Sequence, residues 1–137
     1  MAFRLAAGTL FTLVLAFAPS AAASPQSPFC QDAAVFSKGQ ALQTLPPATL
    51  KADYGRFKTL KAQMVPLAPT SIRPALNSVL TFDLGLFTEL SKVGWTFAKV
   101  PHSVLMQWGV AGPKLKPASD KVITYLDSHC GLKLPKP

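Results

Sequence analysis

Residues 70–97 read TSIRPALNSVLTFDLGLFTELSKVGWTF. Apolar side chains recur there at three- and four-residue steps, from Ile72 through to Phe97, and they cover more than one helix face. A helix that is apolar nearly all round is usually buried at the centre of a domain. We therefore expect a central helix over this stretch, with Thr70 as its cap and Pro74 in its first turn.

The same spacing rules predict further helices on both sides of this stretch. Ser27 followed by Pro28 is a favoured helix start, and Gly131 is a typical stop signal after a last helix. Prolines and glycines interrupt residues 98–117, which predicts an irregular stretch with only a short helix inside it. The further helices are expected at residues 27–45, 49–65, 101–108 and 118–129.

Composition and pattern together indicate an all-α domain. Of the 137 residues, 49% are apolar and 15% are charged, which excludes a disordered polar chain. The 13 prolines exclude long unbroken coiled-coil heptads. No alternation of apolar and polar residues persists long enough to require a sheet. The sequence therefore predicts a small four-helix-type bundle.

The first 23 residues have the order of a secretory signal peptide. Arg4 precedes an uncharged apolar run from Leu5 to Ala18, and small residues follow at Ala21–Ala23. As a helix this run would span about 21 Å, which is short of the roughly 30 Å hydrocarbon core of a bilayer. We expect cleavage after Ala23, which leaves one secreted domain over residues 24–137 without a transmembrane segment.

Cys30 and Cys130 are the only cysteines, and they lie near opposite ends of the expected mature chain. Export places them in an oxidising compartment, where an even number of cysteines indicates a disulfide. The bond would join the first helix to the last, so these helices should pack side by side. Free or intermolecular thiols and a metal site are the alternatives, although no second cysteine or histidine stands at C-x-x-C spacing.

Several sequence features coincide with those of a known group. They are the early Cys30, a middle helix opened by Ala68-Pro69 and followed by Ile72, and the ending Val122-x-x-Tyr125-Leu126-x-x-x-Cys130-Gly131-Leu132. Across residues 28–134 the pattern resembles small secreted two-cysteine helical proteins of actinobacteria. That group has no settled biochemical activity, so the resemblance implies a fold and a compartment rather than a mechanism.

The charge balance favours anionic partners. Lys and Arg number 14 against 6 Asp and Glu, which gives a formal net charge of +8. Lys51, Arg56, Lys58 and Lys61 fall largely off the apolar stripe of their helix. Such a surface suits an anionic envelope polymer or an acidic lipid surface, and the alternative is a solvated face that keeps the protein soluble. Nucleic acid is not expected, because the chain is exported and lacks aromatic–basic interleaving.

An apolar patch is the second candidate site. Its residues are Trp95, Phe97, Leu105, Met106 and Trp108. They form either core and loop cover, or a pocket or membrane-facing surface beside the central helix. A pocket would make the protein a carrier of an apolar ligand, a lipid or haem.

Few residues offer catalytic or cofactor chemistry. Tyr125 and His129 are four apart and share a helix face, where they could ligate a haem iron. Their spacing resembles the Tyr-x-x-x-His pair of secreted mycobacterial haem-binding proteins, although that pair does not stand at the chain's end. The alternative is a half-buried tyrosine and a histidine favoured by the helix dipole. His102 has no partner motif for acid–base catalysis, and no metal-ligand spacing occurs. We expect a binding module that is not an enzyme and has no cofactor.

Overall fold

The described part of the chain is all-α, as expected. The computed structural model describes residues 27–36 and 45–134, and within these ranges there is no β-strand. The expected signal peptide over residues 1–23 lies outside the described residues, as do residues 37–44 of the first expected helix. The elements are α1 (Pro28–Phe36), α2 (Pro47–Leu67), α3 (Arg73–Lys92), the short 3₁₀ helix η2 (Phe97–Lys99) and α4 (His102–Cys130).

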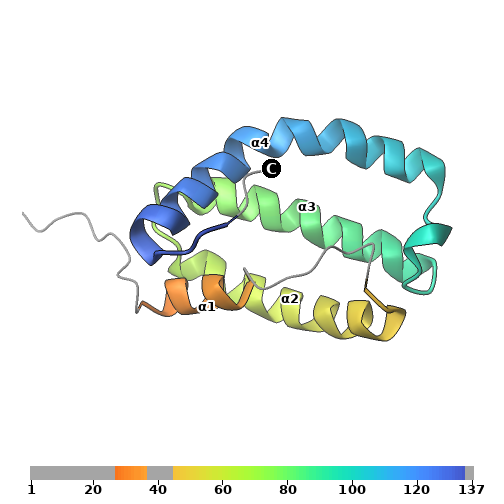
Figure 1. Ribbon diagram of the computed structural model, residues 1–137, viewed down its shortest axis with the longest axis horizontal. Coiled ribbons are helices and arrows are strands. Elements are labelled where there is room, and N and C mark those ends of the chain that lie inside the picture. Colours follow the sequence, from red (N-terminus) through yellow and green to blue (C-terminus); the bar gives the residue numbers. More distant parts are fainter. Residues whose placement is uncertain (1–26, 37–44, 135–137) are drawn as a thin grey trace, which may run out of the picture.

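α3 is the central helix that its apolar pattern predicts. Figure 1 shows α2 and α4 running along α3, with α1 at one end of the bundle. α1 packs against both α2 and α4, so it bridges the two outer helices at that end. The four-helix-type bundle expected from the sequence is confirmed.

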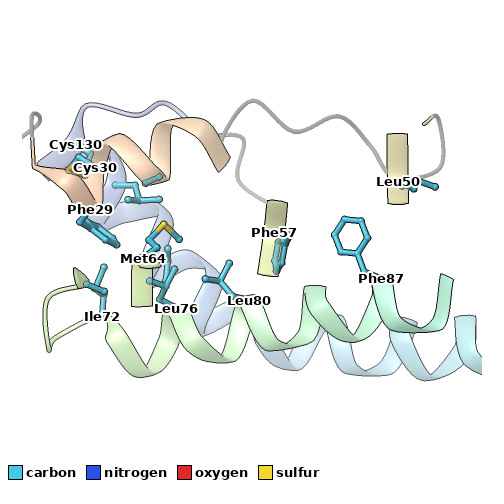
Figure 2. Packing of buried hydrophobic residues seen from close by; sticks show 14 of the residues in the cluster. Phe29, Cys30, Leu50, Phe57, Met64, Ile72, Leu76, Leu80, Phe87 and Cys130 are labelled. Atoms are coloured by element: carbon cyan, nitrogen blue, oxygen red, sulfur yellow. A yellow bond between two sulfur atoms is a disulfide. The ribbon is translucent and has the colours of Figure 1, made fainter. Parts of the chain in front are cut away.

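The core follows one stripe of α3. Leu80 and Leu90 are 1% and 0% exposed, and burial of one such side chain contributes about 1.5–3 kcal/mol. Figure 2 shows this core where Phe29 of α1, Met64 of α2 and Leu76 of α3 lie together. Val122 and Leu126 of α4 belong to the same buried cluster, so one core joins α2 and α4 to α3.

The helix starts on α1 and α2 follow the expected turn chemistry. The Cys30 backbone N–H donates to the Ser27 hydroxyl over 3.2 Å, which confirms Ser27 as the cap of α1. Pro47 stands in the first turn of α2, where a missing N–H costs nothing. α2 is two residues longer at each end than residues 49–65, since it begins at Pro47 and continues through Pro66 to Leu67.

The expected ends of the central helix are wrong. α3 begins at Arg73 after Ile72 and has no side-chain cap, so Thr70 does not cap it. The Arg73 guanidinium instead donates to the Ala68 carbonyl at 2.7 Å, and this contact closes the end of α2. α3 stops at Lys92 because Gly94 takes a positive φ of 66°, from which the chain turns into η2.

The largest correction concerns residues 98–117. They were expected to be irregular around a short helix at residues 101–108, but α4 continues unbroken from His102 to Cys130. Pro113 and Pro117 are four residues apart and both exposed, so the carbonyl groups that they leave unbonded face solvent. Water can satisfy those groups, and α4 curves along α3 instead of breaking (Figure 1).

A disulfide joins the first helix to the last. Cys30 on α1 and Cys130 at the end of α4 are bonded, with 5.3 Å between their Cα atoms. The Phe29 and Tyr125 rings pack edge to face beside the bond, with centroids 6.2 Å apart. The predicted pairing and the side-by-side placement of α1 and α4 are both confirmed.

Candidate binding surfaces

Three of the four basic residues predicted to bind anions share one face of α2. Lys51, Lys58 and Lys61 are separated by seven and three residues, which places them along one line of the helix. We call these three residues the basic stripe. Arg56 lies five residues from both Lys51 and Lys61, so it points away from the stripe. The predicted cluster is therefore divided between two faces.

Contacts with neighbouring side chains hold part of the basic stripe in place. The Lys58 ammonium lies 4.3 Å from the centre of the Tyr54 ring, within the range of a cation–π interaction. The Lys61 ammonium donates to the Thr81 hydroxyl of α3 at 2.8 Å. Neither contact brings a carboxylate to the stripe.

Ion pairs engage several basic residues outside the stripe. The pairs are Arg56–Asp53, Lys92–Glu89, Lys116–Asp120 and Lys133–Asp127. Among the described residues, no carboxylate forms an ion pair with a lysine of the basic stripe. The stripe is thus a row of uncompensated positive charge on one helix.

Part of the predicted apolar patch lines a cavity between α3 and α4. This α3–α4 cavity has a volume of about 300 Å³. The Phe97 and Trp108 rings pack against each other in its wall, with centroids 6.5 Å apart. The lining residues are Phe82, Leu86 and Leu90 of α3, Phe97 of η2, and Leu105, Trp108 and Gly112 of α4.

The other two residues of the predicted patch lie elsewhere. Trp95 packs against Tyr54 of α2 at a centroid distance of 5.4 Å, and it does not line the cavity. Met106 is 56% exposed on the outer face of α4. Met106 follows Leu105 on α4 and so points in a different direction, whereas Trp95 lies in the turn between α3 and η2, where its φ is 62°.

The sequence predicted that the central helix would line such a pocket, but it did not identify the α3 residues that do so, and it missed Gly112. Phe82, Leu86 and Leu90 recur at four-residue steps, which is the signal that could have assigned them to one face. Gly112 was assigned to an irregular stretch, so its place on a helix face was not apparent. A Cβ atom at Gly112 would meet nothing within 4 Å, which means that open space lies beside it.

A second cavity lies inside the bundle near the disulfide-linked end. Its volume is about 270 Å³, and it is lined mainly by apolar side chains. All four helices contribute, including Ala33 of α1 and Met64 of α2, and Leu134 of the C-terminal segment joins them. Four helices border this space, which is partly open to solvent, whereas the α3–α4 cavity lies between two helices.

The two residues predicted as haem ligands stack on each other. The Tyr125 and His129 rings are 4.1 Å apart and inclined by only 6°. The His129 Nδ1 atom lies 2.8 Å from the Ser128 hydroxyl and 3.3 Å from the Tyr125 carbonyl oxygen, which holds the imidazole against its own helix. Neither ring lines either of the two cavities described above.

Asp83 is an acidic residue on the core-facing stripe of α3. This stripe advances by alternating four- and three-residue steps, through Leu76, Leu80, Asp83, Phe87 and Leu90. Its four apolar members are buried. The Asp83 side chain is half-buried, and no ion pair reaches it from the described residues. Burial raises the pKa of Asp83 to about 6.

Within residues 27–36 and 45–134, no group of three or more His, Cys, Asp or Glu side chains is placed to hold a metal ion. None of the described helices combines the length and the apolar character that crossing a bilayer requires. No family model, curated protein or solved structure matches the chain.

Proposed function

We propose that the protein is a secreted, non-enzymatic binding module that uses the basic stripe of α2 to bind anionic components of a cell envelope. The observation that carries this proposal is the row of Lys51, Lys58 and Lys61 on one helix face, without a described carboxylate to compensate it. An anionic lipid surface attracts each nearby lysine by about 1 kcal/mol at physiological ionic strength. Three aligned lysines therefore suffice for weak binding that salt reverses.

Two further observations support a location outside the cytoplasm. The order of residues 1–23 is that of an export signal, and the Cys30–Cys130 bond is typical of an oxidising compartment. Envelope polymers and acidic lipids share the chemistry that the stripe recognises, which is a dense array of negative charge.

Reversing the stripe charges should abolish this binding. In the Lys51→Glu/Lys58→Glu/Lys61→Glu variant, we expect affinity for phosphatidylglycerol vesicles to fall at least about 100-fold at low salt, because three attractive contacts of about 1 kcal/mol are lost. Vesicle co-sedimentation measures the effect. Parallel titration with dextran sulfate distinguishes a lipid surface from a polymer as the preferred partner.

The matched control carries the same change in net charge on other elements. Lys99→Glu/Lys114→Glu/Lys121→Glu replaces three exposed lysines of η2 and α4. The proposal requires a clearly smaller loss for this variant than for the stripe variant. Equal losses would mean that net charge alone drives binding, and an unchanged affinity of the stripe variant would refute the proposal.

The α3–α4 cavity favours a second candidate function, carriage of an apolar ligand. A volume of about 300 Å³ is at the lower end of the range for small-molecule pockets, and the wall is apolar as such pockets usually are. This function depends on α3 and α4 rather than on the lysines of α2, so the stripe variant should leave it intact.

A further inference from the structure

The α3–α4 cavity offers a ligand apolar surface and no charged or polar side chain. Its wall consists of aromatic and aliphatic side chains together with Gly112. A ligand that fills it therefore finds no hydrogen-bond partner among these side chains. Binding is favoured by burial of the ligand's hydrocarbon, and each methylene group removed from water raises the affinity about fourfold.

The spacing of the lining residues gives the length of the cavity along the two helices. Phe82, Leu86 and Leu90 stand four residues apart on α3, so they extend over about 12 Å along the helix axis. Leu105, Trp108 and Gly112 extend over a similar length of α4. A volume of about 300 Å³ over about 12 Å corresponds to a mean cross-section of about 25 Å². We call this space, which is partly open to solvent, the slot.

We propose that this slot binds one unbranched hydrocarbon chain of a single-chain amphiphile. The inference rests on the second candidate function and names its ligand class. Methylene groups pack against carbon atoms at about 4 Å, so a slot of this width takes one extended chain and not two side by side.

Gly112 keeps the slot open on the α4 side. Because a Cβ atom at this position would meet nothing within 4 Å, a larger side chain fits without a clash and occupies the space that a ligand would use. Gly55 of α2 is a matched control, since its Cβ would also meet nothing and it does not line the slot. Both substitutions replace a helical glycine, so both gain similar helix propensity.

The binding test uses Trp108 as the reporter. Trp95→Phe leaves Trp108 as the single tryptophan, and Trp95 does not line the slot. Straight-chain fatty acids from octanoate to palmitate are titrated below their micelle concentrations, and Trp108 emission is recorded. We expect affinity to rise about fourfold per methylene and then to reach a plateau once the slot is filled.

On this background, Gly112→Leu should weaken binding at least about 10-fold, whereas Gly55→Leu should leave it unchanged. Helical circular dichroism confirms that each variant is folded, and Leu86→Trp blocks the slot from α3 if Gly112→Leu fails to fold. The charge-reversed stripe variant should still bind the fatty acids, which separates this site from electrostatic attraction to α2.

Three results would overturn the inference. Equal binding by Gly112→Leu and Gly55→Leu would place the chain outside the slot. Affinity for fatty acids that does not depend on their chain length would refute the chain assignment and retain the carrier function. The same conclusion would follow if fatty acids did not bind and haemin did, with haemin binding lost in Gly112→Leu. The absence of saturable binding by every fatty acid and by haemin would contradict both the assignment and the carrier function.

Discussion

Replacing Cys30 and Cys130 together by alanine will lower the free energy of unfolding by about 4.7 kcal/mol. The two cysteines are 100 residues apart, and the chain-entropy model assigns this value to a closed loop of about that length. Without the bond the unfolded chain gains the freedom that the loop removes. Alanine is preferred to serine because Cys30 and Cys130 are 2% and 8% exposed, and a buried hydroxyl would add its own cost.

Equilibrium urea unfolding measures this loss. The wild-type protein unfolded in the presence of a reductant is the control, and its free energy should match that of the double variant. α1 has only nine residues, a length at which an isolated helix is marginal in water. We therefore expect the backbone amide hydrogens of α1 to exchange with solvent faster than those of the other helices in the variant. A loss below about 1 kcal/mol would contradict the constraint that we assign to the bond.

The second large effect concerns Asp83 and the pH dependence of stability. Its pKa is about 6 in the folded protein against a model value of 3.8, because burial disfavours the carboxylate. The folded state therefore holds a proton that the unfolded state has released between about pH 4 and pH 6. The contribution of Asp83 to stability therefore falls as the pH rises through this window and levels off above it, with a total of up to about 3 kcal/mol.

Asp83→Asn removes the titrating group and keeps the size of the side chain. The variant should gain stability over the wild type as the pH rises from about 4 to about 7, by up to about 3 kcal/mol. Urea midpoints across this range measure the difference. Asp127→Asn is the control, because exposed ion pairs such as Asp127–Lys133 contribute at most about 1 kcal/mol. Parallel pH profiles for Asp83→Asn and the wild type would contradict the raised pKa.

Helix-capping and periodicity rules predicted those parts of the fold in which residues close together in the sequence determine the local structure. The Ser27–Pro28 start of α1 and the apolar stripe of α3 depend on residues a few positions apart. The prolines of α4 show where such rules fail. Pro113 and Pro117 would break a buried helix, but the packing of α4 on α3 leaves both on the solvent side. That orientation is a tertiary property, which no single segment reveals.

In the candidate sites, too, the sequence predicted groups of neighbouring residues but not how distant segments come together. Phe97, Leu105 and Trp108 were identified because they lie close in sequence, and the structure places them around one cavity. Trp95 and Met106 were grouped with them but point elsewhere, because Trp95 stands in the turn before η2 and Met106 lies on the outer face of α4. The opposite wall belongs to α3, and only the antiparallel packing of α3 and α4 brings Phe82 and Leu86 to it.

The central claim is that Cys30 and Cys130 close α1 onto α4 around a shared core. Tryptic digestion of the non-reduced protein, with iodoacetamide present from lysis onward, tests it directly. We predict one disulfide-linked species that joins the peptide ending at Lys38 to the peptide Val122–Lys133, and no alkylated cysteine before reduction. Alkylation of both sulfur atoms in the untreated protein would contradict the architecture.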